Sequence, residues 1–476
     1  MVFSSIIFLL YFLPVFLFTY YLADKKYKNA VILIFSIFFY SWGAPKFIFV
    51  ILGTTFLDFF LVKWMSKTKT RLYRRIMLTL SVSINLGLLF YFKYSGFFIE
   101  NVDIVLTHLF HAHALGWTKL ILPLGISFYT FETITYVVDV YRGVHKPLDN
   151  FWNYQLYIIL FPKLIAGPII RYHELADQIT DREQNETIDD RLMGFYRFII
   201  GLSKKVLIAN QMGMVADNVF QSNYSGLSTY AAWIGILAYT FQIYFDFSGY
   251  SDMAIGIARM IGFKFPENFN NPYISQSITE FWRRWHMSLG RWMKNYLYIP
   301  LGGNRVDSKL RLYFNLWFVF LISGLWHGAS WNFVFWGAYH GTFLALERAF
   351  LLKIYDKIGK LFRTMLTFLI VAIGWVFFRV EKFHDAISYI KRMFAFDGKT
   401  YTLDIGSQFY TLFIIAAFFA FFSYLKWTTK LQDAVFNGAY SNTRHTVAAA
   451  LSLILFVLSI GNIAATGFNP FIYFRF

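Results

Sequence analysis

The sequence contains no cysteine among its 476 residues. This absence excludes disulfide bonds, thiolate metal sites and thioester chemistry on the chain itself. Charged residues are scarce at 15%, and they comprise 44 Lys and Arg but only 27 Asp and Glu. No segment is typical of a soluble domain with a basic face, so no nucleic-acid partner is expected. The sequence also lacks internal repeats and the G-x-S-x-G, P-loop and G-x-G-x-x-G motifs.

Apolar residues dominate the chain instead. Hydrophobic residues make up 57% and aromatic residues 22%, with a mean hydropathy of +0.47, whereas a soluble domain averages about 45–50% apolar residues. We therefore expect an all-α, multi-pass membrane protein with about 11–13 crossings, folded as a single domain over residues 1–476. The apolar spans lie near 3–22, 29–43, 47–65, 77–99, 118–140, 151–170, 194–215, 229–247, 312–326, 329–346, 364–380, 408–427 and 447–466.

Basic loops indicate an orientation in the membrane. Residues 24–28, 67–75 and 141–146 are rich in Lys and Arg, so the positive-inside rule places them in the cytoplasm and the N-terminus outside. Such loops, together with anionic membrane lipids as partners, account for the net charge of +17. The first span lacks a basic leader and a cleavage site, so we expect it to be retained as a helix. A polar insertion at 171–191 is expected on the surface.

The stretch NFNNPYISQSITEFWRRWHMSLGRWMKNYLYIPLGGNR (268–305) is dense in aromatic and basic residues. We expect an amphipathic helix from Thr279 to about Tyr296, because aromatic residues recur there at i, i+3, i+4 and i+7. Such a helix would lie in the membrane interface, with His286 at the border of its two faces. The expected apolar face comprises Trp282, Trp285, Leu289, Trp292, Met293 and Tyr296, and the basic side comprises Arg283, Arg284, Arg291 and Lys294.

Five ionisable residues fall within predicted apolar spans, where such groups are costly and are functional candidates by default. They are Glu132, Asp246, Asp252, His327 and His340. A structural role is the alternative. Neighbouring Tyr, Thr and Ser side chains can satisfy Glu132 and Asp246 by hydrogen bonding, which would make both carboxylates contacts between helices.

His327 lies in SGLWHGASWNFVFWGAYHG (323–341), where each histidine is followed by glycine. Burial would keep its imidazole neutral and able to accept a proton, as a general base for acyl transfer requires. Gly328 and Gly341 would let a backbone or a substrate come close. The alternative is a core histidine hydrogen-bonded to a neighbouring helix, which spacing alone favours. His286 has a similar alternative as an interfacial anchor.

A histidine triplet in THLFHAH is a weak metal-binding candidate. His108, His111 and His113 lie close together in the sequence, but in a loop with no nearby carboxylate. No metal site is therefore expected.

Several segments occur in an order typical of one family. They are PLGISFYTFETITYVVDVYRG, FPKLIAGPIIRY, QIYFDFSGYSDMAIGIARMIGF, the stretch 268–305 and SGLWHGASWNFVFWGAYHG, with FNPFIYFRF at the end. With them the sequence resembles the membrane-bound O-acyltransferase (MBOAT) family, and most of all its bacterial alginate, peptidoglycan and cellulose O-acetylation branch. The resemblance implies a ring of helices around a funnel or tunnel, with a core motif region at about 118–346 and C-terminal helices at 361–476.

The resemblance also implies roles for individual residues. It makes His327, in the family's WHG segment, a catalytic residue, and His286 a second catalytic position. The eukaryotic branch has Asn at that second position, so the role of His286 is less defined, and His340 is expected to be structural. The basic residues implied to attract coenzyme A at a cytoplasmic mouth are Arg283, Arg284, Arg291 and Lys294. The residues expected to line or support the tunnel are Asp246, Tyr250, Trp326, Asn332 and Glu132.

The implied reaction is transfer of acetyl from acetyl-CoA across the bacterial cytoplasmic (inner) membrane, for O-acetylation of an extracytoplasmic polysaccharide. Acetyl-CoA would be a substrate, and no tightly bound cofactor is expected. Because the chain has no sizeable soluble domain, a periplasmic or extracellular SGNH-type acetyltransferase is implied as partner. Two alternatives stay open: D-alanyl transfer to teichoic acid, and transport of polysaccharide or lipid, for which internal repeats would be typical.

Overall fold

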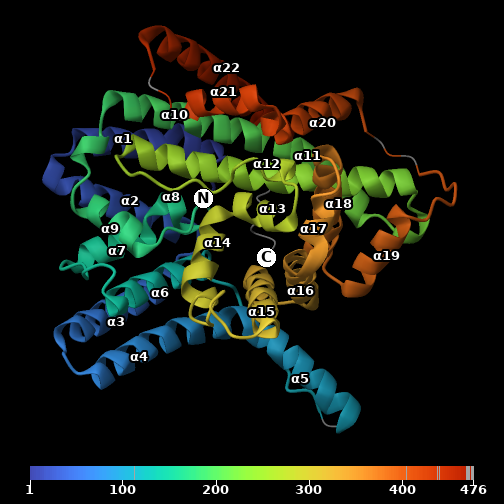
Figure 1. Ribbon diagram of the computed structural model, residues 1–476. Coiled ribbons are helices and arrows are strands. Elements are labelled where there is room, and N and C mark those ends of the chain that lie inside the picture. Colours follow the sequence, from blue (N-terminus) through green and yellow to red (C-terminus); the bar gives the residue numbers. More distant parts are fainter. Residues whose placement is uncertain are drawn as a thin grey trace. The chain divides into compact units, whose positions relative to one another are not determined.

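The computed structural model describes residues 1–476 except 112, 119, 402, 404, 437, 439, 468–471 and 473–476. The described residues form helices and no strand (Figure 1), as expected for an all-α protein. They divide into two compact units, Met1–Arg191 with Ala258–Phe265, and Leu192–Ile257 with Pro266–Phe476. The single domain expected from the sequence stays a prediction.

The first unit contains the N-terminal helices. In chain order they are η1 Phe8–Phe12, α1 Leu13–Leu22, η2 Lys25–Tyr27, α2 Lys28–Gly43, α3 Ile48–Lys67, α4 Arg71–Leu89, η3 Phe90–Tyr94, α5 Ser95–Leu109, α6 Ile126–Arg142, α7 Phe151–Ile159, α8 Phe161–Leu164, α9 Tyr172–Thr180 and η4 Glu183–Asn185. Helices α3, α4 and α6 pack against one another. Helix α4 continues through the π-helix η3 into α5, so the three form one helical segment of 39 residues, which bends between α4 and α5 (Figure 1).

The structure adds detail to two sequence features of this unit. The apolar span 151–170 is not one helix, because α7 ends at Ile159 and α8 covers only four residues. Pro162 explains the break, since proline has no N–H to donate and its ring clashes with the carbonyl one turn earlier. The polar insertion 171–191 is not simply a surface loop either. It contains α9, whose apolar face, with Leu175 and Ile179, is buried.

The second unit contains the remaining helices, some of which start or end just outside it. They are α10 Ile188–Ser203, η5 Lys204–Ala209, α11 Asn210–Gln221, η6 Tyr224–Gly226, α12 Thr229–Met260, η7 Pro272–Ile274, α13 Ile278–Arg284, α14 Met287–Met293, η8 Lys294–Tyr298, α15 Lys309–His327, α16 Trp331–Leu346, η9 Glu347–Leu351, α17 Leu352–Tyr355, α18 Lys360–Arg379, α19 Phe383–Met393, α20 Ser407–Ala420, η10 Phe422–Tyr424, α21 Lys426–Phe436 and α22 Asn442–Thr466.

Stacked indole rings form the centre of the second unit. Trp285, Trp336 and Trp375 are buried, and the Trp375 ring centroid lies 5.0 Å from that of Trp285 and 5.9 Å from that of Trp336. Large aromatic side chains bury much apolar area and pack with defined geometry. The three indole rings join α16, α18 and the segment after α13, and this segment leads directly to His286.

Five helical segments in the described part of the chain are long and apolar enough to cross a membrane. They are Ile48–Lys67, Arg71–Leu109, Lys360–Arg379, Ser407–Tyr424 and Asn442–Thr466. A span needs about 20 apolar residues, and several other apolar helices, such as α16 with 16 residues, are shorter. The count of 11–13 crossings stays a prediction.

Candidate active site

The helix expected from Thr279 to Tyr296 is interrupted at His286. Helix α13 ends at Arg284, and His286 has left-handed backbone angles, φ 45° and ψ 53°, immediately before α14. The uninterrupted helix was therefore a wrong expectation. Hydrogen bonds from a distant segment hold the break open: Asn270 N–H donates to Arg284 O and Met287 N–H donates to Asn268 O, both at 2.9 Å. These bonds satisfy backbone groups that a continuous helix would have paired internally.

The two expected faces survive the break. Of the expected apolar face, Trp285, Leu289, Trp292 and Met293 are buried. Arg283 and Lys294 on the basic side are exposed. Each short helix is therefore amphipathic. The position of the His286 ring is determined by the break between the helices, and not by the border of two faces on one helix.

His286 is buried, with 1% of its surface exposed. Its Nδ1 lies 3.1 Å from Asn268 Oδ1, and its ring meets the Phe247 ring edge-on with centroids 4.7 Å apart. Burial lowers the pKa of the His286 imidazole, because desolvation disfavours the charged form. Its Nε2 has no hydrogen-bond partner among the described residues. Sequence reasoning did not single out Asn268, although the polar run NFNNPY was the available signal.

His327 is the last residue of α15, which begins at Lys309 after a charged loop. The ring centroids of His286 and His327 are 6.5 Å apart, so the structure brings the two predicted catalytic residues together. Three aromatic rings surround His327: Trp326 at 4.9 Å, Trp336 at 5.3 Å and Phe378 at 5.2 Å. Trp326 also lies 6.2 Å from His286. Trp326 therefore contacts both histidines, which fits its expected supporting role.

Glycines set the position of α15 against α16. A Cβ at Gly341 would come within 3.0 Å of the Trp317 Cα and carbonyl oxygen, and one at Gly324 would overlap the Phe333 carbonyl oxygen. Small residues at such contacts allow close backbone approach between membrane helices. The expected close approach of a backbone at Gly341 is thus confirmed. At Gly328 the neighbour is instead the ring of Phe333. The close approach fixes the end of α15 that carries His327.

A cavity of about 480 Å³ opens beside His286. Its lining includes three of the four predicted cations, Arg283, Arg291 and Lys294, and Ser323, one turn before His327 on α15. Arg284 does not line it, because its guanidinium pairs with Glu280 at 2.9 Å. The other lining residues are Thr279, Trp282, Trp285, Met287, Leu289, Gly290, Met293, Tyr298, Asn304, Leu316, Val319, Phe320 and Leu344. The cavity is apolar with a cationic edge.

The buried carboxylates pair with lysines rather than with their hydroxyl neighbours. Glu132 in the first unit forms an ion pair with Lys163. Asp246 on α12 lies 2.8 Å from Lys205 Nζ and accepts a hydrogen bond from Ile472 N–H at 2.8 Å. The expectation that Tyr, Thr or Ser satisfies them was therefore wrong. Buried charges without an opposite charge are expensive, which makes a lysine the better partner.

The remaining candidates have structural surroundings. Tyr250 is buried one turn after Asp246 on α12. Asp252 pairs with Arg197 at 2.8 Å and with Lys204 at 2.6 Å. These groups brace α12 against α10 and η5.

Two further candidates lie on α16. Asn332 donates its amide N–H to Val380 O. His340 is buried between the Trp282 and Trp336 rings, 5.0 and 5.1 Å away. Neither His340 nor Asn332 lines the cavity beside His286. In the described part of the chain no three of His108, His111, His113 and other such side chains group as metal ligands.

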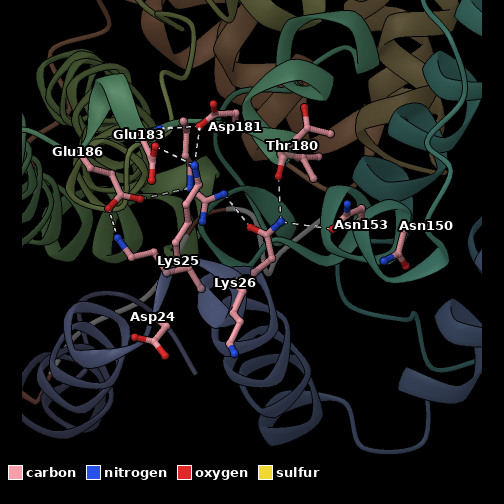
Figure 2. A pocket seen from close by; sticks show the side chains of 13 residues that line it. Asp24, Lys25, Lys26, Asn150, Asn153, Thr180, Asp181, Glu183 and Glu186 are labelled. Carbon is pink, nitrogen blue, oxygen red and sulfur yellow. Dashed lines mark hydrogen bonds and ion pairs between the residues drawn. The ribbon is translucent and has the colours of Figure 1, made fainter.

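The first unit has a polar cavity of about 710 Å³ (Figure 2). Most of its charges are paired within it: Lys28 binds Glu186, and Lys25 lies 2.7 Å from Glu183. Figure 2 shows Glu183 and Glu186 turned toward basic side chains of this cavity, whereas Asp24 and Lys26 point away. None of the predicted site residues lines it. The lining comprises Asp24, Lys25, Lys26, Lys28, Asn29, Asn150, Asn153, Ile179, Thr180, Asp181, Arg182, Glu183 and Glu186.

Comparison with known proteins identifies the family of the chain. Residues 144–378, which include both histidines, match the MBOAT, membrane-bound O-acyltransferase family. The chain is 42% identical to the probable alginate O-acetylase of Pseudomonas putida over the full length of both proteins. The chain belongs to the membrane-bound O-acyltransferase family. This MBOAT protein is thus an acyltransferase and a multi-pass membrane protein.

Two further relatives are named for two different reactions. The MBOAT chain is 37% identical to the peptidoglycan O-acetyltransferase of Helicobacter pylori, over 84% of this chain and 80% of that protein. It is 29% identical to the teichoic acid D-alanyltransferase of Bacillus subtilis, over 56% of this chain and 71% of that protein. The first match covers more of the chain at higher identity.

Proposed function

We propose that this membrane O-acetyltransferase takes acetyl from cytoplasmic acetyl-CoA and passes it across the bacterial cytoplasmic (inner) membrane, for O-acetylation of an extracytoplasmic polysaccharide. The observation that carries the proposal is the pair of buried histidines, 6.5 Å apart by ring centroids, with His286 lining a cavity edged by Arg283 and Lys294. Acyl transfer to a hydroxyl needs a base, and the cavity offers charge for an anionic donor.

The histidines supply the proton chemistry. When the hydroxyl oxygen attacks the acetyl carbonyl carbon, its proton passes to a neutral imidazole and the C–S bond breaks, leaving a thiolate that takes up a proton. His327 acts as that base, or carries the acetyl briefly on its ring nitrogen. A covalent stage on a cysteine is impossible, since the chain has none. His286 assists the transfer.

The cationic edge of the cavity suits the phosphates of coenzyme A. Arg283, Arg291 and Lys294 all line it, whereas the described lining contains no carboxylate. Guanidinium and ammonium groups bind phosphate through charge-assisted hydrogen bonds. The apolar walls suit the thioester arm, which carries little charge. Acetyl-CoA then enters as a substrate rather than as a resident cofactor.

The polysaccharide acceptor follows from the relatives named for alginate and peptidoglycan O-acetylation. We assign the final transfer to a separate SGNH-type acetyltransferase in the periplasm or outside the cell. The chain lacks the G-x-S-x-G motif and a sizeable soluble domain that could do this work.

The test uses membranes that contain the protein and acetyl-CoA labelled with ¹⁴C in the acetyl group. Thioester consumption and label on a co-expressed partner or glycan are compared for the native chain and His327→Ala. We expect turnover in the native chain and at least a hundredfold loss in His327→Ala. His340→Ala is the matched control, since that histidine is also buried but lies between the Trp282 and Trp336 rings, and the resemblance assigns it a structural role. Equal turnover in the native and His327→Ala chains would remove His327 from the mechanism.

D-alanyl transfer is the second candidate, because the Bacillus subtilis relative carries that name. It predicts no use of acetyl-CoA and turnover only with a D-alanyl carrier protein. Supplying each donor separately to the same membranes distinguishes the two reactions.

A further inference from the structure

The side-chain amide of Asn268 has a defined orientation. The Ser288 backbone N–H, which can only donate, lies 3.2 Å from Asn268 Oδ1, and the Ser288 hydroxyl donates to the same oxygen at 2.8 Å. On the other side, Asn268 Nδ2 donates to the Ser251 hydroxyl at 3.1 Å. Exchanging the amide oxygen and nitrogen would put N–H groups against N–H groups. Oδ1 is therefore the atom that faces Ser288 and His286.

This orientation determines the tautomer of His286. Oδ1 is only an acceptor, and the Ser288 hydroxyl, which lies 3.4 Å from His286 Nδ1, gives its one proton to Oδ1 at 2.8 Å. The His286 Nδ1, 3.1 Å from Oδ1, therefore carries its own proton and donates it. A neutral imidazole has one N–H, so Nε2 has a lone pair and no proton. Burial lowers the pKa of this ring, which keeps it neutral. Among the described residues no donor meets Nε2, and the residue lines the cavity.

The backbone around His286 supports the same arrangement. His286 has a positive φ of 45°, which costs a non-glycine residue free energy and is found where the surroundings impose it. Asn268 contributes to this as well, since its carbonyl oxygen accepts the Met287 N–H at 2.9 Å. Asn268 thus holds both the backbone turn at His286 and the orientation of the His286 ring.

We propose that Asn268 is a positioning residue that holds His286 as its Nδ1–H tautomer, so that Nε2 accepts a hydrogen bond from the hydroxyl group that receives the acyl group, and takes its single proton when His327 carries the acetyl. This inference rests on the proposed function and specifies what His286 binds. A thioester carbonyl offers only acceptor atoms, so an unprotonated Nε2 gives it no hydrogen bond. A hydroxyl is a donor and meets Nε2 directly. His286 therefore orients the acceptor, and the donor's carbonyl is held by other groups.

The tautomer can be measured without activity. The full-length protein in detergent or nanodiscs is labelled with ¹⁵N in the imidazole nitrogens, and the ¹⁵N spectrum reports which nitrogen is protonated. The spectrum of His286→Asn identifies the signals of His286 among those of the ten histidines. We expect a protonated Nδ1 and an unprotonated Nε2 at neutral pH. A protonated Nε2 in the native protein overturns the proposal.

Two variants of Asn268 test the consequence for turnover. Asn268→Leu has a similar size but no acceptor, and we expect kcat to fall at least about tenfold with KM for the thioester unchanged, as removal of an orienting partner does. Asn268→Asp keeps an acceptor facing Nδ1 and should recover most of the kcat and the Nδ1–H signal. A kcat that both variants lower equally, or a loss confined to thioester KM, contradicts the proposal.

Failure of this inference differs from failure of the proposed function. If His327→Ala retains turnover, the assignment of the reaction fails while the ¹⁵N spectrum of His286 is unaffected. If Asn268→Leu does not fold, as judged by gel filtration, the tautomer of the native protein still decides the question alone.

Discussion

Two cavities of the protein are both lined by lysine and arginine, yet their charges are compensated in different ways. In the first unit, Lys25 lies 2.7 Å from Glu183, and Lys28 pairs with Glu186. The lining therefore contains the acids that neutralise its bases (Figure 2). Around the cavity beside His286, the described lining holds Arg283, Arg291 and Lys294 but neither Asp nor Glu.

The difference separates a structural network from a candidate binding site. A cation already paired within the protein gains little from a ligand, because it must exchange one partner for another. A cation at the edge of an apolar cavity without a carboxylate attracts an anion from solution. The number of basic residues is thus a poor guide to function, and the position of the compensating acids is a better one.

The largest effect is expected from breaking the network in the first unit. Glu186 contacts Lys28 and accepts the Tyr20 hydroxyl at 2.6 Å, with only 8% of its side chain exposed. Glu186→Gln leaves the lysine without its charge partner, which should destabilise the protein by about 3 kcal/mol. Thermal unfolding in detergent measures the loss. KM for acetyl-CoA in the folded fraction should not change, and a raised KM would show that this cavity also serves the donor.

An intermediate effect is expected from removing charge at the cavity beside His286. The double variant Arg283→Gln/Lys294→Gln removes two exposed cations, each contributing about 0.7 kcal/mol to phosphate binding. KM for acetyl-CoA should rise about tenfold with little change in kcat. Added salt should reduce the difference from the native enzyme.

Arg284→Gln is the matched control for this variant. It removes a single charge, from the neighbouring position, but Arg284 pairs with Glu280 and does not line the cavity. Its KM should equal that of the native enzyme. A KM raised about threefold, half the effect of the double variant in free energy, would mean that the donor responds to total charge rather than to charge at the cavity.

Sequence reasoning predicted the parts of the site that depend on local pattern. Local pattern predicts the apolar span 312–326, which corresponds to α15, the close approach at Gly341 and the sidedness of Trp285 and Arg283. The resemblance to known acyltransferases selected His286 and His327, and the structure then placed their rings 6.5 Å apart.

The parts that were missed depend on distant residues. The periodicity across His286 is uninterrupted, and the break arises from hydrogen bonds to Asn268 and Asn270, which no helical pattern encodes. The lysine partners of Glu132 and Asp246 likewise come from other segments, 31 residues away in the case of Lys163. Buried polar groups find partners wherever the fold brings them, so local neighbours predict them badly.

The smallest effect is expected at the exposed rim of the first cavity. Lys25 and Glu183 lie 2.7 Å apart, but their side chains are 61% and 59% exposed. Water screens such a pair, and ordering two long side chains offsets most of the attraction. Lys25→Gln should therefore leave both the unfolding temperature and KM for acetyl-CoA unchanged within error. A raised KM for this variant, without a change in unfolding temperature, would contradict the distinction between a cavity lined by carboxylates and one without them, because a cation with its own carboxylate would then be contributing to donor binding.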